Sequence, residues 1–227
     1  MQEILLPFTF EERRPFLGEG FLYIPKYYSD HQSFSLEECF PNKKALSVEF
    51  CSGNGEWIIK RARQYSHINW IAVEKRLDRA KKIYKKKEEE KLDNLFVVIG
   101  DGYTFAKYYL KEDSLKIAYI NFPDPWPKNR HSKHRLIDPF FEEELKRVLP
   151  LNHKVIVVTD DIEYRDLAIE LFSPFWKAEF PYPNYIQKWP AYGSSFFERL
   201  WKGKKREIYY ISYSNNKKYD STGFLGS

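Results

Sequence analysis

Cysteine is scarce in this sequence of 227 residues, which contains Cys39 and Cys51 and no CxxC pair. One possible disulfide in a chain of this length is not a disulfide scaffold. No apolar run approaches the roughly 20 residues that cross a bilayer. Residues 1–15 also lack the basic head and long apolar core of a secretory signal. We therefore expect a cytoplasmic protein in a reducing compartment, without a membrane span.

A strong excess of one charge is also missing. The chain carries 37 Lys and Arg against 32 Asp and Glu, a net charge of +5. A solvated surface explains so mild an excess, so the positions of the cations decide whether they indicate a nucleic-acid partner. Aromatic residues are abundant, with 6 Trp, 17 Tyr and 18 Phe. This composition excludes wholesale disorder and supplies a sizeable core.

Three segments differ in character. Residues 1–43 are irregular, aromatic and rich in proline, which predicts an arm laid over the main domain. Residues 44–214 alternate between apolar runs and helical patterns and form that domain. Residues 215–227 are polar and predict a loose tail.

The alternation predicts an α/β fold with a mostly parallel sheet and helices on both faces. Ligands bind such sheets at the carboxyl ends of the strands. Asp138 and Pro139 have the residue types of a helix cap and a first helical position. The predicted strands are 45–50, 69–74, 95–100, 115–122 and 153–160, and the predicted helices are 56–65, 76–92, 101–110, 138–149 and 163–172.

Acidic residues follow the first three predicted strands. Glu49 ends the first strand, and Gly53 and Gly55 let the next turn approach a ligand before a helix begins. Glu74 lies about 20 residues after these glycines, where an acid accepts hydrogen bonds from a ribose diol. Asp101 follows the third strand. Each acid alone also fits a helix cap or a surface charge, but together they would converge on one cleft.

The fourth strand leads into a rigid loop, NFPDPWPK (121–128). Three prolines in five residues hold Asp124 and Trp126 in place. A cationic run with no acidic residue follows, which suits phosphates around a base that reaches the carboxylate. The run comprises Lys128, Arg130, Lys133 and Arg135.

Two histidines in this run, His131 and His134, have the spacing of metal ligands on a helix. No cysteine or acidic partner stands nearby at zinc-ligand spacing. We therefore expect no metal.

The loop and the cationic run together, NFPDPWPKNRHSKHRL (121–136), resemble nearly end to end the signature of the tRNA (guanine-N7-)-methyltransferases. That family is a branch of the Rossmann-like class I methyltransferases that use S-adenosylmethionine. The resemblance covers residues 45–213 and implies a seven-stranded sheet whose last strand is antiparallel, with 177–181 and 207–214 as strands six and seven. Further matching segments, in the family's order, are EFCSGNG (49–55), AVEKR (72–76), GDG (100–102), VTD (158–160) and SSFFE (194–198).

The resemblance also implies roles for individual residues. Asp124 matches the active-site position, and the implied substrate is guanine 46 in the variable loop of tRNA. The implied S-adenosylmethionine site comprises Glu49, Gly53, Gly55, Glu74, Asp101 and Asp124. The implied substrate site comprises Lys128, Asp160, Ser195, Phe196, Phe197 and Glu198, with Arg130, Lys133 and Arg135 as further RNA contacts.

Two positions depart from the family pattern. Cys51 stands where the family usually has glycine, and Ser195 stands where it often has threonine. Cysteine is small and the other two glycines remain, so we expect cofactor binding to survive with a shifted turn. The hydroxyl at Ser195 is kept.

Guanine N7 carries a lone pair and no proton, so its methylation needs no general base. Positioning and charge stabilisation can supply the catalysis. Asp124 either stabilises the cationic guanine or grips the cofactor and the guanine edge, and the sequence leaves both roles open.

Two other functions compete with this interpretation. Asp-Pro-Trp also suggests enzymes that methylate exocyclic amines of bases or protein glutamine, although their second consecutive proline is missing here. The other is a non-catalytic RNA-binding module, against which Glu74, Asp101 and Asp124 argue. We expect tRNA as the partner and no obligate protein partner.

Overall fold

The computed structural model describes residues 4–9, 12–26, 28–31, 36–126 and 135–216. Five residues singled out in the cationic run therefore lie outside the described residues, as does the tail from 217 onward. These five are Lys128, Arg130, His131, Lys133 and His134.

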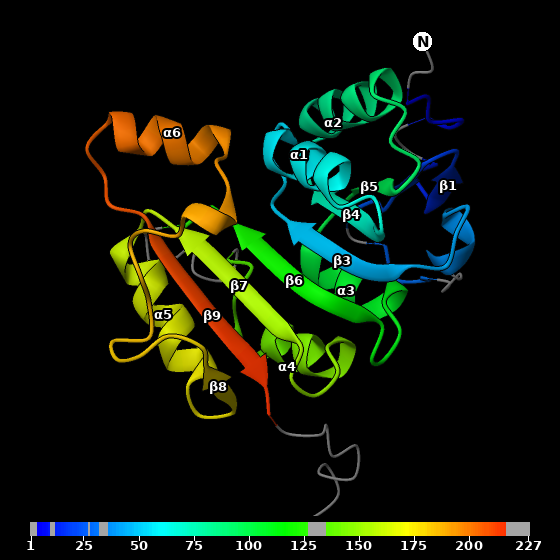
Figure 1. Cartoon of the computed structure of the whole chain (residues 1–227). Helices are drawn as coiled ribbons and strands as arrows, with labels where there is room; N and C mark the ends of the chain where they lie inside the picture. Colours follow the sequence, from blue (N-terminus) through cyan, green and yellow to red (C-terminus); the bar gives the residue numbers. More distant parts are fainter. Residues whose placement is uncertain (1–3, 10–11, 27, 32–35, 127–134, 217–227) are drawn as a thin grey trace, which may run out of the picture.

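A nine-stranded sheet forms the centre of the molecule, in the order β1-β2-β5-β4-β3-β6-β7-β9-β8 (Figure 1). Its central strands are mostly apolar, which is typical of strands buried on both faces. The strands are β1 (Phe16–Gly18), β2 (Phe21–Tyr23), β3 (Ala45–Phe50), β4 (Ile68–Glu74), β5 (Leu95–Ile99), β6 (Leu115–Asn121), β7 (Lys154–Thr159), β8 (Trp176–Ala178) and β9 (Tyr209–Asn215).

Strands β3 to β9 form the expected seven-stranded arrangement. β3 pairs in parallel with β4 and β6, whereas β9 runs antiparallel to both β7 and β8. The sheet has two strands more than the seven expected, because the arm contributes β1 and β2. β2 pairs in parallel with β5, and β1 pairs antiparallel with β2. Residues 16–23 are thus part of the sheet rather than a layer over it.

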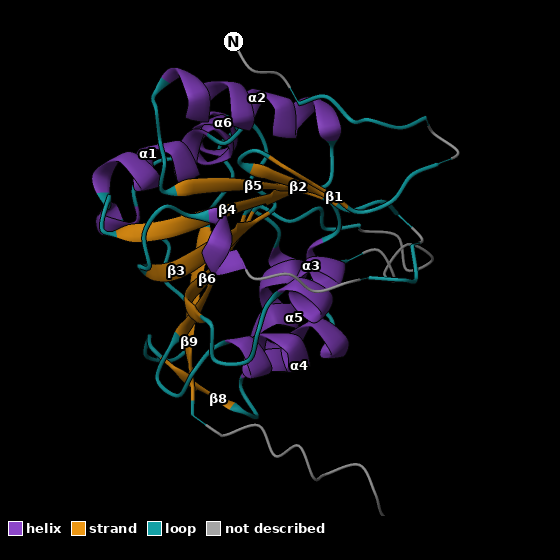
Figure 2. Cartoon of the chain, turned by 90° about the vertical axis from the view of Figure 1, so that its right-hand side faces the viewer, coloured by secondary structure: helices purple, strands orange, loops and turns teal. Residues whose placement is uncertain are grey.

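Helices cover both faces of the sheet (Figure 2). α1, α2 and α6 lie on one face, and α3, α4 and α5 on the other. In the described part of the chain, no helix is long and apolar enough to cross a membrane. The helices are α1 (Glu56–Gln64), α2 (Leu77–Glu89), α3 (Gly102–Tyr109), α4 (Pro139–Val148), α5 (Ile162–Phe172) and α6 (Phe196–Gly203), with short 3-10 helices at Leu36–Cys39 and Pro190–Tyr192.

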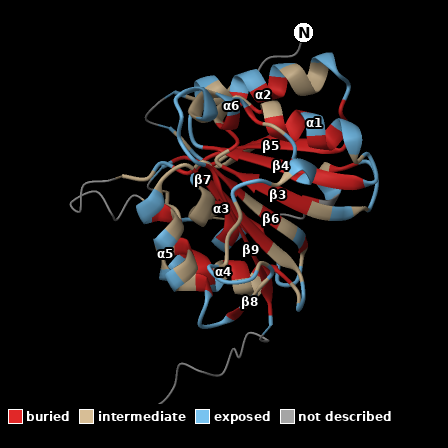
Figure 3. Ribbon diagram, turned by 60° about the vertical axis from the view of Figure 1, so that its left-hand side comes forward, coloured by how far each residue is buried: buried red, intermediate tan, exposed pale blue. Residues whose placement is uncertain are grey.

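The two faces of the sheet build two apolar cores, and the alternation of side chains along β4 shows how. Trp70 and Ala72 belong to the core under α1 and α2, while Ile71 and Val73 belong to the core under α3, α4 and α5. Figure 3 shows the buried central strands between the helical layers. The middle of the sheet is therefore a rigid base for the loops at its edge.

The carboxyl ends of β3, β6 and β7 point to one edge, and α6 lies above it (Figure 1). Helix boundaries near this edge follow local chemistry. The Asp138 side chain accepts a hydrogen bond from the backbone N–H of Phe141, and Pro139 is the first residue of α4, as predicted. The strand-end residues of interest thus come together along this edge.

Candidate active site

Glu49, near the end of β3, is buried with 1% of its surface exposed. Asn121, at the end of the neighbouring β6, donates a hydrogen bond from Nδ2 to Glu49 Oε1 at 2.6 Å. The Tyr192 hydroxyl donates in turn to Asn121 Oδ1 and fixes the orientation of the amide. Glu49 Oε2 accepts no hydrogen bond from the described residues. A buried carboxylate oxygen is thus left to face the cavity at the sheet edge.

Burial raises the pKa of Glu49 to about 8, and the hydrogen bond from Asn121 opposes this shift only in part. The carboxyl group is therefore largely protonated at neutral pH unless a cation reaches it. A positively charged group that entered the cavity would favour the ionised form. Glu49 thus has the chemistry of a cation-binding group.

Glu74, at the end of β4, lies against the glycine-rich turn. Its Oε2 accepts a hydrogen bond from the backbone N–H of Gly53 at 2.8 Å, and its Oε1 accepts one from the N–H of Arg76 at 2.9 Å. Burial raises the pKa of Glu74, and these two backbone hydrogen bonds oppose the shift. The carboxylate therefore shapes the turn itself, beside any contact with a ligand.

The turn after β3 depends on left-handed backbone. Gly53 has φ +56° and Gly55 has φ +76°, and a β carbon on Gly53 would lie 2.8 Å from the Phe197 ring. Cys51 has φ +61°, so a side chain occupies a conformation that favours glycine. Burial raises the pKa of the Cys51 thiol, which is therefore not an activated nucleophile.

Replacing Cys51 with glycine is expected to raise the free energy of unfolding by up to about 1 kcal/mol. The gain is the left-handed strain of roughly 1–2 kcal/mol, less the added backbone entropy of glycine in the unfolded chain. Cofactor affinity should be kept or raised. Cys51→Ala is the matched control, because alanine keeps the β carbon and the strain. Denaturant unfolding and titration calorimetry measure both effects, and loss of turnover in Cys51→Gly with intact cofactor binding would instead give the thiol a chemical role.

The Asp124 carboxylate lies at the surface of the site. It accepts a hydrogen bond from Lys75 Nζ at 2.8 Å, and 59% of its side chain is exposed. The same Lys75 Nζ lies 5.6 Å from the centre of the Trp126 ring. Phe122 and Trp126, at the two ends of the described part of this loop, have φ +46° and +44°. The loop is thus held in a strained conformation that presents Asp124 outward.

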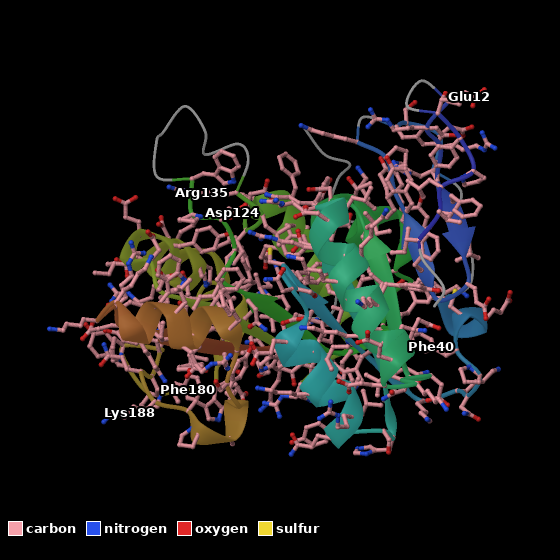
Figure 4. All side chains as sticks on the ribbon, turned by 90° about the horizontal axis from the view of Figure 1, so that it is seen from above. Glu12, Phe40, Asp124, Arg135, Phe180 and Lys188 are labelled. Atoms are coloured by element: carbon pink, nitrogen blue, oxygen red, sulfur yellow. The ribbon has the colours of Figure 1, made fainter. Side chains whose placement is uncertain are left out.

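Arg135, a predicted RNA contact, is held by its own loop and by α5. Its Nε donates to the carbonyl oxygen of Pro125 at 2.9 Å, and its Nη2 lies 3.8 Å from the Glu163 carboxylate. Only 16% of its side chain is exposed. Arg135 therefore anchors the Asp124 loop, and Figure 4 shows the two residues close together.

Asp101 is the N-cap of α3. Its Oδ1 accepts hydrogen bonds from the backbone N–H of Thr104 at 2.9 Å and from the Thr104 hydroxyl at 3.1 Å. The residue is exposed at the edge of the sheet. The capping role considered from the sequence is therefore present, and any contact with a cofactor would use the other carboxylate oxygen.

Ser195 and Glu198 form a capping box at the start of α6. The Ser195 hydroxyl accepts from the Glu198 N–H at 3.0 Å, and Glu198 Oε2 accepts from the Ser195 N–H at 3.3 Å. The Phe197 ring packs 6.1 Å from Phe122, and Phe196 is exposed. The start of α6 thus closes a cavity of about 20 Å³ lined by Glu49, Cys51, Ser52, Asn121 and Phe197.

Asp160 follows β7 and pairs with Arg206, which comes from the segment between α6 and β9. Its side chain is 12% exposed. The structure therefore brings Glu49, Gly53, Glu74 and Phe197 together. Asp160 and Arg206 lie further along the same edge, in the surroundings of α6.

Several residues of this site were missed at the sequence level. Asn121, Lys75 and Tyr192 are part of it, and so is Arg61, whose Nη2 donates to the carbonyl oxygen of Ala191 at 3.1 Å. Asn121 and Lys75 stand inside motifs that the sequence already pointed to, so their position at a strand end was the available signal. Tyr192 and Arg61 reach the site through tertiary packing, for which no local signal exists. Among the described residues, no group of three or more His, Cys, Asp or Glu is arranged to hold a metal ion.

The strand order and the acidic strand ends define the molecule as a Rossmann-like class I methyltransferase. Solved structures share this fold. The 16S rRNA methyltransferase KamB is 17% identical, with a TM-score of 0.58 over 80% of this chain and 93% of that one. The Haemonchus contortus phosphoethanolamine N-methyltransferase 2, in complex with S-adenosyl-L-methionine, is 11% identical, with a TM-score of 0.50 over 80% of this chain and 51% of that one.

Sequence relatives narrow the class further. A family model described as "Putative methyltransferase" matches residues 43–211. The tRNA (guanine-N(7)-)-methyltransferases of Chlamydia pneumoniae and Chlamydia caviae are 40% and 41% identical, each over 93% of this chain and 96% of the relative. The Oceanobacillus iheyensis protein of the same name is 35% identical over 60% of this chain and 63% of the relative. The chain belongs to the tRNA (guanine-N7-)-methyltransferase family.

Proposed function

We propose that the protein transfers the methyl group of S-adenosylmethionine to N7 of a guanine in tRNA, at position 46 of the variable loop. The buried, unpaired Oε2 of Glu49 beside the glycine turn is the observation that carries the cofactor part of this proposal. The family relatives support the substrate part. Asp124 supports the chemistry, because its carboxylate lies two residues after Phe122, which lines this pocket, and Lys75 holds it.

The residues at the sheet edge fit S-adenosylmethionine, which supplies an electrophilic methyl group on a sulfonium. Glu49 would hold a cationic part of the cofactor and Glu74 its ribose diol, while Gly53 lets the backbone approach. Asp101 would contact the cofactor through its other carboxylate oxygen, since Oδ1 caps α3. The cavity of about 20 Å³ has room for little more than one water molecule, and the Phe197 ring forms part of its wall.

The protein's own part in the reaction is positioning and electrostatics. Guanine N7 is a nucleophile without deprotonation, so the site needs no general base. The guanine becomes cationic as the new bond forms, and the Asp124 carboxylate favours that charge over the neutral ground state. Lys75 and Arg135 hold Asp124 and its loop in place. The proposed substrate contacts at Ser195–Glu198 and Asp160 extend this surface along α6.

Incubation with labelled S-adenosylmethionine and unmodified tRNA tests the proposal, followed by mapping of the labelled nucleotide. We expect a single 7-methylguanosine at position 46. Label at N7 of another guanine would change only the proposed position. Label on an exocyclic amine would show a different methylation reaction. Absence of both label transfer and cofactor binding would indicate a non-catalytic RNA-binding module.

A further inference from the structure

A groove of about 730 Å³ lies beside α6, next to the cavity at Glu49, and shares Glu198 and Arg206 with the surroundings of α6 described above. The segment before α6 and the first residues of β9 form its walls. Tyr210 and Ile208 are buried at 1% and 2% exposure, and they give the groove an apolar base. Trp189 lines it as a partly exposed indole that packs edge-on against the Phe180 ring at 5.2 Å. The groove is therefore a built, aromatic-lined feature of the fold.

Cations surround this groove. Residues 188–206 carry six cationic side chains and one acidic side chain. Lys188, Lys202 and Arg206 line the groove itself, and Lys204 and Lys205 follow at the end of α6. The acidic residues that line it are Glu198, which pairs with Lys202, and Glu207, which accepts a hydrogen bond from the Tyr209 hydroxyl. Arg206, which lines the groove, pairs with Asp160, so the excess positive charge comes from Lys188, Lys204 and Lys205 and favours an anionic occupant.

The groove meets the active site at the start of α6. Ser194 lines the groove, and its neighbour Ser195 lines the small cavity beside Glu49. Viewed from above, Lys188 lies on one side of α6, and Asp124 and Arg135 lie on the other (Figure 4). A ligand that occupied both the groove and the site would therefore have to cross the start of α6. Such a ligand is a polymer rather than a small molecule.

An aromatic floor with a cationic rim is the chemistry that binds single-stranded nucleic acid. Bases stack on aromatic rings irrespective of sequence, and lysines neutralise the backbone. We propose that this groove holds unpaired nucleotides of the tRNA next to the target guanine, with a base on Trp189 and phosphates on Lys188, Lys204 and Lys205. The inference rests on the proposed function and adds a second RNA-binding surface to it.

The test is a triple variant, Lys188→Ala/Lys204→Ala/Lys205→Ala, with tRNA binding measured at three salt concentrations. Each lost phosphate contact should lower the logarithmic salt slope by about 0.7–0.9, so the triple variant should lose about 2–3 in slope. The Michaelis constant for tRNA should rise about ten-fold or more, with turnover at saturating tRNA and cofactor affinity nearly kept.

A matched control removes the same charge from the opposite edge of the sheet. The variant Lys43→Ala/Lys111→Ala/Lys116→Ala changes exposed lysines near the amino ends of β3 and β6. It should bind tRNA like the parent. Trp189→Ala should weaken tRNA binding roughly ten-fold without changing the salt slope, because stacking involves no counterion release.

The inference is overturned if the groove triple variant and the control triple variant bind tRNA alike at every salt concentration. That result is distinguishable from failure of the proposed function, which would appear in the parent as absence of 7-methylguanosine. A loss of cofactor affinity as large as the loss of tRNA affinity in the groove triple variant would also overturn the inference, since the lysines would then act on the cofactor pocket instead of RNA.

Discussion

Replacing Asp124 with asparagine is expected to lower turnover at saturating tRNA by about 10²–10³-fold, the usual cost of removing one preorganised electrostatic group. Asparagine keeps the shape of the side chain and removes its negative charge. That charge matters most when the guanine turns cationic, so the Michaelis constant for tRNA should change little. Single-turnover methyl transfer at saturating cofactor and tRNA measures the effect.

Lys75 provides the matched control for this substitution. Lys75→Met breaks the same surface ion pair, whose partners are 52% and 59% exposed, but keeps the negative charge of Asp124, whose loop Arg135 still anchors. Exposed pairs contribute about 0–1 kcal/mol, so the stability of both variants should stay close to that of the parent. Most of the turnover should survive in Lys75→Met. If Asp124→Asn instead loses only cofactor affinity, the carboxylate grips the cofactor and does not stabilise the guanine.

Cofactor affinity is expected to rise as the pH increases from 6 to about 8, by up to ten-fold per unit, and to lose this dependence in Glu49→Gln. The empty-site pKa of Glu49 is raised to about 8 by burial, whereas a bound cation requires the ionised carboxylate. Binding must therefore release a proton below that pH. Parent and variant share any titration of the cofactor itself, so the difference between their calorimetric pH profiles isolates Glu49.

The raised pKa of Glu49 makes the folding stability change with pH in the direction opposite to the cofactor affinity. Its pKa lies at about 8 in the folded protein against a usual 4.5, so the folded state keeps a proton that the unfolded chain has released. The free energy of unfolding therefore falls as the pH rises through this window, by at most about 1.4 kcal/mol per unit. Glu49→Gln should remove this fall, and its stability advantage over the parent should grow up to about pH 8.

Glu142 offers a control for burial alone. It is 3% exposed on α4, away from the cofactor pocket, and pairs with Lys146 Nζ at 2.9 Å. Glu142→Gln should leave the cofactor affinity and its pH dependence unchanged. A flat affinity profile in the parent would contradict the role proposed for Glu49.

Residues that local pattern and parallel pairing control were predictable from the sequence. Glu49 and Glu74 lie at the ends of neighbouring parallel strands, so their convergence follows from topology, and the structure adds the hydrogen bond from the Gly53 N–H to Glu74. The Asp138 cap of α4 could also be predicted from the sequence. Arg135 was not, because a positive charge in a cationic run does not reveal whether its guanidinium faces RNA or the carbonyl oxygens of its own loop.

Two elements escaped prediction although part of their signal was present. One is α6, which begins at a capping box formed by Ser195 and Glu198. The helix is short, and these two residues were interpreted as substrate contacts rather than as a cap. In the arm, Glu19 and Gly20 make a two-residue turn between β1 and β2. The pairing of β2 with β5 has no local signal, since its partners lie far apart in the chain.

The attachment of the arm to β5 sets an order of events during synthesis. Phe21 pairs with Val97, so roughly 75 residues must be translated before β2 can find its partner, about 4–15 s at typical elongation rates. Until then the apolar segment 16–23 has no partner strand outside the ribosome. Once β5 docks, β2 and β1 cover an edge that would otherwise recruit strands from other chains. Residues 16–23 thus wait for residues 95–99 to be made, and they then protect that edge of the sheet.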